Sequence, residues 1–132
     1  MGAIQSLQVD QIGHGTRALE APALVAHLVE KQIPVEMCPM SNVRTGVVDN
    51  LEDHPIRKYF DQGMIVNVNT DDPKMFGASL AEEYPLLEQK CSSSKQDVCR
   101  SILFGIESSW LPADRQESLI QSLENDPSWI SN

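Results

Sequence analysis

The stretch IVNVNTDDP, residues 65–73, joins an apolar run rich in β-branched residues to two adjacent carboxylates, Asp71 and Asp72. Such a run is typical of a buried strand, and Pro73 cannot continue the strand because it lacks a backbone N–H. Two interpretations of the aspartates are open. As turn residues they would satisfy nearby backbone groups, since Asp-Pro commonly opens a turn. As site residues they would lie at the carboxyl end of a strand, where parallel α/β folds bind ligands and metals.

Strand patterns and helix patterns alternate on the N-terminal side of this stretch. Strands are expected over residues 9–16, 33–39 and 65–69, helices over residues 2–7, 21–32 and 54–63, and a loop over residues 41–53. Pro22 suits a first helical turn, and Gly63 suits the position just after a helix. Alternation at this spacing predicts βαβ units with right-handed crossovers. We therefore expect an α/β fold with a parallel sheet.

The chain becomes wholly helical after this alternating region. Helices are expected over residues 80–90, 95–110 and 112–126, and Pro85 predicts a kink or break in the first of them. There is no internal repeat, low-complexity tract or linker, and 132 residues suffice for one domain at most. We therefore treat residues 1–132 as a single unit.

Charge and hydropathy exclude several classes of partner. Nineteen acidic residues against ten basic ones give a net charge of -9, which repels phosphate backbones and anionic membranes. No apolar run approaches the roughly 18 residues that span a bilayer, and the first ten residues lack the pattern of an export signal. The three cysteines form no Cys-x-x-Cys pair, so no disulfide framework or structural zinc site is predicted. We expect a cytoplasmic protein that binds neither nucleic acid nor membrane.

Each expected strand ends in residues that can carry chemistry. The first ends at His14 between two glycines, the second at the run CPMSN, residues 38–42, and the third at Asp71 and Asp72. The carboxyl ends of parallel strands lie at one edge of a sheet, so these side chains can converge although they are far apart in sequence. The other two histidines, His27 and His54, are interpreted as structural or surface residues.

Five segments together resemble the C-terminal part of the adenosine/adenine deaminase family. They are QIGHGTRALE, EMCPMSNVRTGVV, HPIRKYFDQG, VNVNTDDPKMFGASL and SSWLPADRQESLI, and they span nearly the whole chain, from about residue 9 to residue 124. The resemblance implies a zinc-dependent hydrolytic deaminase built on a (β/α)₈ barrel. In that family, water activated by zinc attacks C6 of a purine and ammonia leaves. Adenosine, or a related 6-aminopurine, would thereby become inosine or the corresponding 6-oxo product.

The resemblance also assigns roles to three residues of this sequence. Asp71 matches the aspartate that ligates the metal, and Asp72 matches the carboxyl that hydrogen-bonds purine N7. His14 matches the histidine that orients and stabilises the attacking hydroxide. Adjacent residues at the end of a strand point in different directions, so one carboxylate could face the metal while its neighbour faces the base.

The family's other essential groups have no counterpart in this sequence. A complete member needs a His-x-His pair on its first strand, and a third metal histidine and a general-acid glutamate on its fifth. A (β/α)₈ barrel takes about 250 residues. We therefore expect residues 1–132 to be a partial domain, the last three βα units of the barrel followed by helices, and to be inactive alone.

A noncatalytic role is the alternative. The chain would then be an inert assembly or interaction module that pairs its open sheet edges with another chain or with itself. If it belongs to an enzyme, its expected partner is a small purine nucleoside or base. Whether that substrate is adenosine, adenine or a modified purine stays open, because most residues that would read the ribose or phosphate lie in the part of the family fold not found here.

Overall fold

The computed structural model describes residue 4 and residues 8–129 of the chain. Within this part the chain forms an α/β fold of short strands and helices. In chain order the elements are η1 (Ala18–Glu20), α2 (Pro22–Lys31), β1 (Val35–Met37), α3 (Pro39–Arg44), η2 (Leu51–Asp53), α4 (Ile56–Asp61), β2 (Val66–Val68), α5 (Pro73–Phe76), α6 (Leu80–Gln89), α7 (Lys95–Glu107) and α8 (Ala113–Glu124). The helix expected over residues 2–7 lies outside the described residues, apart from Ile4.

Strands β1 and β2 form the parallel pair that the sequence predicts, with Val35 opposite Val66 and Met37 opposite Val68. The segment expected as a first strand over residues 9–16 contributes one parallel bridge, between Ile12 and Val35. Both backbone groups of Ile12 bond to the segment around β1: its N–H donates to Pro34 O at 3.0 Å and its carbonyl accepts from Glu36 N at 2.8 Å. The prediction of a full strand was therefore wrong. The chain leaves the sheet directly after Ile12, and three parallel segments still lie side by side.

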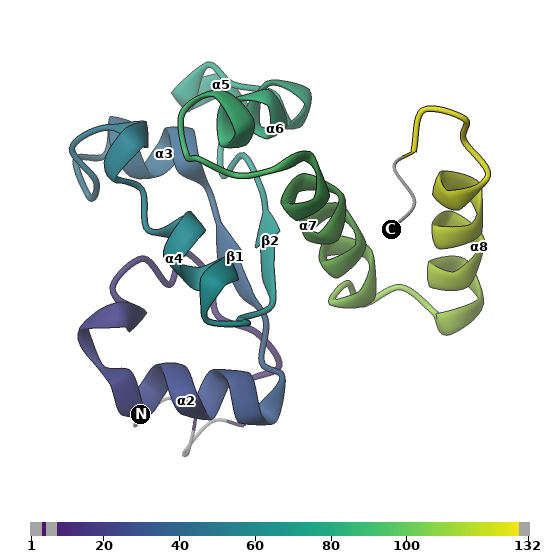
Figure 1. Ribbon diagram of the computed structural model, residues 1–132, viewed down its shortest axis with the longest axis horizontal. Helices are drawn as coiled ribbons and strands as arrows, with labels where there is room; N and C mark the ends of the chain where they lie inside the picture. The colour runs from purple at the N-terminus through teal and green to yellow at the C-terminus, as the bar shows by residue number, and fades with distance from the viewer. Residues whose placement is uncertain (1–3, 5–7, 130–132) are drawn as a thin grey trace.

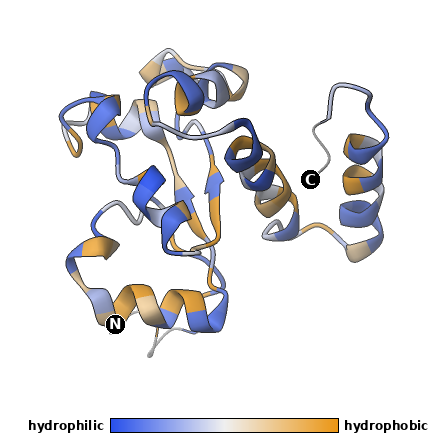
Figure 2. Cartoon of the chain, viewed as in Figure 1, coloured by the Kyte–Doolittle hydropathy of each residue, from blue (hydrophilic) through white to orange (hydrophobic). Residues whose placement is uncertain are grey.

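The core lies between this small sheet and the helices around it. Val35, Met37, Val66 and Val68 are all at most 3% exposed. They pack with buried residues from four helices, namely Val25 and Leu28 of α2, Ile56, Tyr59 and Phe60 of α4, Leu87 of α6, and Val98 of α7. In Figure 1, α3, α5 and α6 gather at one end of the strands and α2 lies at the other. Figure 2 shows the strands as largely hydrophobic, in agreement with their burial.

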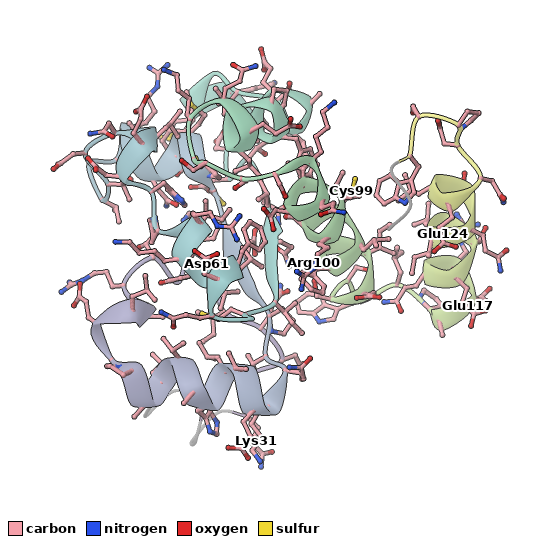
Figure 3. All side chains as sticks on the ribbon, in the orientation of Figure 1. Lys31, Asp61, Cys99, Arg100, Glu117 and Glu124 are labelled. Atoms are coloured by element: carbon pink, nitrogen blue, oxygen red, sulfur yellow. The ribbon has the colours of Figure 1, made fainter. Side chains whose placement is uncertain are left out.

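Helix α8 is set apart from this core. In Figure 1, α7 lies between the strands and α8. Helix α8 contains no buried residue. In Figure 3 the labelled Glu117 and Glu124 lie on this outer helix, and Lys31 lies at the distant end of α2.

Three other expectations need correction. The loop predicted over residues 41–53 contains most of helix α3 and all of η2. Pro39 at the first turn of α3 favours that helix, although the polar residues after it suggest a loop. A further short helix, α5, follows Asp72. Pro85 does not break α6, because both Pro85 and Ala81, whose carbonyl loses its helical donor, are exposed to solvent.

No helix in the described part of the chain has the length and apolar character needed to cross a membrane.

Candidate functional site

The three segments that end at the sheet edge bring their polar side chains together. Ser41 donates a hydrogen bond of 2.7 Å to Oδ2 of Asp71. The same oxygen lies 3.6 Å from Nε2 of His14. Asn42 joins the group from α3, since its Nδ2 lies 3.2 Å from Nδ1 of His14. The structure therefore brings together His14 and Asp71, as the sequence predicts, with Ser41 and Asn42 of the run that ends the second expected strand.

Both His14 and Asp71 have a left-handed backbone, with φ angles of 61° and 62°. This conformation is uncommon for residues other than glycine, and it occurs often at functional sites. Three other non-glycine residues of the described part, Gln8, Gln32 and Ser92, share it and lie outside the site. The side chains of His14 and Asp71 remain 49% and 38% exposed, so both are accessible to a ligand.

The segment that follows His14 is held between β1 and α4. A Cβ atom at Gly15 would lie 2.4 Å from Cγ1 of Val35, so only glycine fits against the strand. The buried hydroxyl of Tyr59 in α4 accepts a hydrogen bond from the backbone N–H of Ala18 at 3.1 Å and donates one to the carbonyl of Gly15 at 2.6 Å. Helix α4 therefore holds the segment that follows His14.

Asp72 has different partners from its neighbour. Its Oδ1 accepts hydrogen bonds from the backbone N–H groups of Lys74 at 3.0 Å and Met75 at 2.9 Å, and so caps α5. The turn interpretation therefore holds for Asp72. Asp71 instead faces Ser41 and His14. The two adjacent carboxylates thus point to separate surroundings, one at the loop cluster and one at the start of a helix.

A buried carboxyl supports the helix that carries Ser41 and Asn42. Glu83 of α6 is fully buried, and both of its oxygens accept from the backbone N–H of Met40, at 3.4 Å and 3.3 Å. Burial raises the pKa of Glu83 to about 7, and the hydrogen bond from Met40 opposes part of that rise. Sequence reasoning missed Glu83. Its spacing offers a signal, because it lies one helical turn before the buried Leu87.

The thiol nearest the site is not reactive. Burial raises the pKa of Cys38 to about 12, and the carboxylates of Glu36 and Asp71 act in the same direction. Since the thiolate is the form that attacks electrophiles or ligates metals, Cys38 stays a neutral core residue at physiological pH. The three cysteines are free thiols, and Cys91 is buried as well.

His54 is a buried structural residue rather than a surface one, with 4% exposure. Its Nε2 lies 3.0 Å from Oδ1 of Asn42, and its Nδ1 lies 3.3 Å from the backbone N of Ile56. Burial lowers the pKa of His54 to about 4, so its ring is neutral at physiological pH. His27 lies half-buried on α2. Of the two histidines set aside from the sequence, only His54 contacts the cluster.

Asp71 offers the cluster a carboxylate, one of the side-chain types that ligate zinc. No group of three or more His, Cys, Asp or Glu side chains in the described part is arranged to hold a metal ion. Catalytic zinc sites generally use three protein ligands. The carboxylate of Asp71 is accessible and of a suitable type, so it fits one position of such a site, and the others would have to come from outside these residues.

His14 and Asp71 thus lie 3.6 Å apart, both accessible, where two parallel segments of the chain end. The family model described as "Adenosine deaminase" matches residues 1–126. The chain therefore belongs to the adenosine deaminase family, as its sequence motifs predict.

Curated relatives agree with this assignment. The chain is 34% identical over 131 residues to the aminodeoxyfutalosine deaminase of Streptomyces coelicolor, covering 98% of this chain and 34% of the relative. It is 39% identical over 117 residues to the adenine deaminase of Crocosphaera subtropica, covering 89% and 36% respectively. It is 34% identical over 119 residues to the adenosine deaminase of Klebsiella pneumoniae, covering 90% and 36%. The chain spans about a third of the length of these relatives.

Solved structures give the same result. The adenine deaminase of Arthrobacter aurescens superposes with a TM-score of 0.87 at 34% identity, covering 91% of this chain and 37% of that one. An amidohydrolase from Burkholderia ambifaria with bound Zn superposes with a TM-score of 0.82 at 25% identity, covering 92% and 34%. The arrangement of the described elements is therefore that of a corresponding third of these enzymes.

Proposed function

We propose that this chain is the segment of a zinc-dependent purine deaminase that carries the last three βα units of a (β/α)₈ barrel. The convergence of His14, Ser41, Asn42 and Asp71 at neighbouring strand ends is the observation that supports the proposal. In barrel enzymes, catalytic residues come from the ends of several strands at one face. The reaction is hydrolysis of the 6-amino group, so that adenosine, or a related 6-aminopurine, yields inosine, or the 6-oxo product, and ammonia.

Asp71 would serve as the ligand that this segment contributes to the metal. When bound, zinc lowers the pKa of a water molecule toward about 7 and so supplies hydroxide at neutral pH. Ser41 holds the carboxylate of Asp71 through Oδ2. His14, 3.6 Å from the same oxygen, would orient and stabilise the nucleophile at the moment of attack on C6.

Asp72 would contact the purine base. Purine N7 is a hydrogen-bond acceptor, so a carboxyl must carry a proton to donate to it. Oδ1 of Asp72 caps α5 and so orients the side chain, and Oδ2 is the oxygen that would contact the base. The curated relatives are named for adenosine, adenine and aminodeoxyfutalosine. A 6-aminopurine is therefore the substrate class that we assign.

Complementation tests this function. The purified chain would be assayed for zinc content and for ammonia release from adenosine and adenine, alone and mixed with a separately expressed N-terminal part of a family member. We expect no turnover and little zinc from the chain alone, and zinc-dependent deamination from the mixture. Asp71→Asn should abolish that activity. Asp114→Asn, an exposed aspartate in the first turn of α8, is the matched control and should retain it. Equal activity of both variants would contradict the assignment of Asp71.

An assembly role is the second candidate, and the surface beside β2 favours it. A cavity of about 410 Å³ opens there, lined by Asn67 and Asn69 near β2, Tyr84 of α6 and Trp110 after α7. Trp110 is 84% exposed. In the described part, β2 pairs only with β1, so its other edge has no strand partner. If the chain alone oligomerises through this edge and no complementation restores deamination, the assembly role replaces the enzymatic one.

A further inference from the structure

His54, Asn42 and His14 form a chain of hydrogen bonds whose direction is fixed at one end. The backbone N–H of Ile56 can only donate, so Nδ1 of His54 must accept from it, at 3.3 Å. A neutral imidazole then carries its proton on Nε2. That nitrogen lies 3.0 Å from Asn42, which must present its carbonyl oxygen, Oδ1, to accept the proton.

The orientation of Asn42 determines the form of His14. With Oδ1 facing His54, the amide nitrogen of Asn42 faces Nδ1 of His14 at 3.2 Å. An amide NH₂ group only donates, so Nδ1 of His14 must accept. The proton of a neutral His14 is therefore on Nε2, the nitrogen that lies 3.6 Å from Asp71.

We infer that His54 is a positioning residue which, through Asn42, holds His14 as the tautomer that presents an Nε2–H donor to Asp71. His54 and Asn42 are buried, with 4% and 1% exposure, so water does not compete for the hydrogen bond between them. The role of the donor in deamination rests on the proposed function. The tautomer itself depends only on the hydrogen bonds described here.

Nitrogen NMR of the imidazole rings reads the tautomer directly. The chain contains only three histidines, His14, His27 and His54, so a long-range ¹H–¹⁵N spectrum is simple to assign with one variant of each. The measurement is made at a pH well above the usual histidine pKa of about 6.5. We expect both His14 and His54 to show a protonated Nε2 and an unprotonated Nδ1. A protonated Nδ1 at His14 in the unaltered chain would overturn the inference without any variant.

Two variants separate positioning from packing. Asn42→Asp places acceptor oxygens toward both histidines, so His14 should change to the Nδ1–H tautomer while His54 keeps its own. His54→Gln keeps a donor for Asn42 and should leave the His14 tautomer unchanged. His27→Gln, on α2, is the control that should alter neither. An unchanged His14 signal in folded Asn42→Asp protein would overturn the relay.

The catalytic consequence is measured in the complemented enzyme. His54→Leu removes the donor to Asn42, frees the amide to rotate, and should lower kcat about 10- to 100-fold with little change in KM. His54→Gln should recover most of that loss. If His54→Leu does not fold, His54→Gln and Asn42→Asp carry the test. If His14 shows the Nε2–H tautomer but the complemented enzyme does not deaminate, the relay is upheld and the proposed function is contradicted. If the complemented enzyme deaminates but His14 shows the Nδ1–H tautomer, only the relay is contradicted.

Discussion

Ser41 and Asp71, thirty residues apart in sequence, are joined by a 2.7 Å hydrogen bond in which the Ser41 hydroxyl donates to Oδ2 of the carboxylate. Ser41 is 1% exposed, whereas the side chain of Asp71 is 38% exposed. A buried group on α3 therefore sets the orientation of an accessible group after β2. This is the arrangement expected when a carboxylate must be held ready for a ligand.

Ser41→Ala should weaken metal binding without removing the ligand itself. Loss of the hydroxyl leaves Asp71 free to rotate, and outer partners of metal ligands typically contribute 10- to 100-fold in affinity. Zinc titration of the complemented enzyme measures the effect. Ser109→Ala is the control and should leave zinc affinity unchanged, because the hydroxyl of Ser109, after α7, bonds only to the carbonyl of Ile106 among the described residues.

Asp71→Asn and Asp72→Asn should separate metal binding from substrate binding. A neutral amide is a much poorer ligand for Zn²⁺, so the Asp71 variant should lose both zinc and turnover. Asparagine caps helices as well as aspartate does, so Asp72→Asn should keep α5 and the metal. Since its amide nitrogen can still donate to purine N7, KM and kcat should change far less than in the Asp71 variant. Zinc analysis together with steady-state kinetics distinguishes the two. Full zinc occupancy in the Asp71 variant would contradict the assignment of Asp71 as a metal ligand.

His14→Ala should lower kcat by roughly two to four orders of magnitude, the range for a positioned acid–base group. Binding of a ground-state purine should change little, because the imidazole acts on the nucleophile. The measurements are kcat in the complemented enzyme and the dissociation constant of a purine product. A variant that keeps its specific activity per folded molecule would assign His14 to structure instead.

Glu83→Gln should remove a loss of stability that develops as the pH rises from about 4.5 to 7. Burial raises the pKa of Glu83 from an ordinary 4.5 to about 7. Its stabilising contribution is therefore complete below pH 4.5 and lost as the pH rises through 7. The pKa of His54 is lowered from 6.5 to about 4, so its contribution to stability is present above pH 6.5 and is lost as the pH falls through 4. Because His54 titrates in the same way in both proteins, the difference between their free energies of urea unfolding isolates Glu83. That difference should change between about pH 4.5 and 7 and stay constant at higher pH.

Gly15→Ala should destabilise the chain by about 1–3 kcal/mol, because the added methyl would lie against Cγ1 of Val35. Gly13→Ala is a matched control two residues away, since its added Cβ would meet nothing within 4 Å. The free energy of unfolding is the readout. Equal values for the two variants would show that the loop moves away from β1 at little cost.

The order of elements and the meeting of His14 with Asp71 could be predicted from sequence because both follow from strand direction. Parallel strands end at one edge, so the residues after them converge whatever their spacing along the chain. The extent of the strands could not be predicted in the same way. Residues 9–16 have the composition of a strand, but only Ile12 pairs with a neighbour.

Ser41, Asn42 and His54 show where sequence reasoning stops. The polar composition of residues 41–53 favours a loop, and no local pattern reports that Ser41 and Asn42 are held in α3 by contacts with distant segments. His54 resembles a helix-opening residue. Its burial depends on tertiary packing, which composition does not encode. Glu83 could have been found, because its helical spacing places it on the same face as Leu87.

The clamp of Tyr59 on the segment after His14 has a consequence for local opening. Ala18 gives its backbone N–H to the Tyr59 hydroxyl across 41 residues of sequence, and Tyr59 is fully buried in α4. That amide can exchange with solvent deuterium only when α4 separates from the loop. The exchange rate of the Ala18 amide proton therefore reports how often the segment after His14 separates from α4. The opening of this loop is thus coupled to a helix whose Tyr59 lies 41 residues further along the chain.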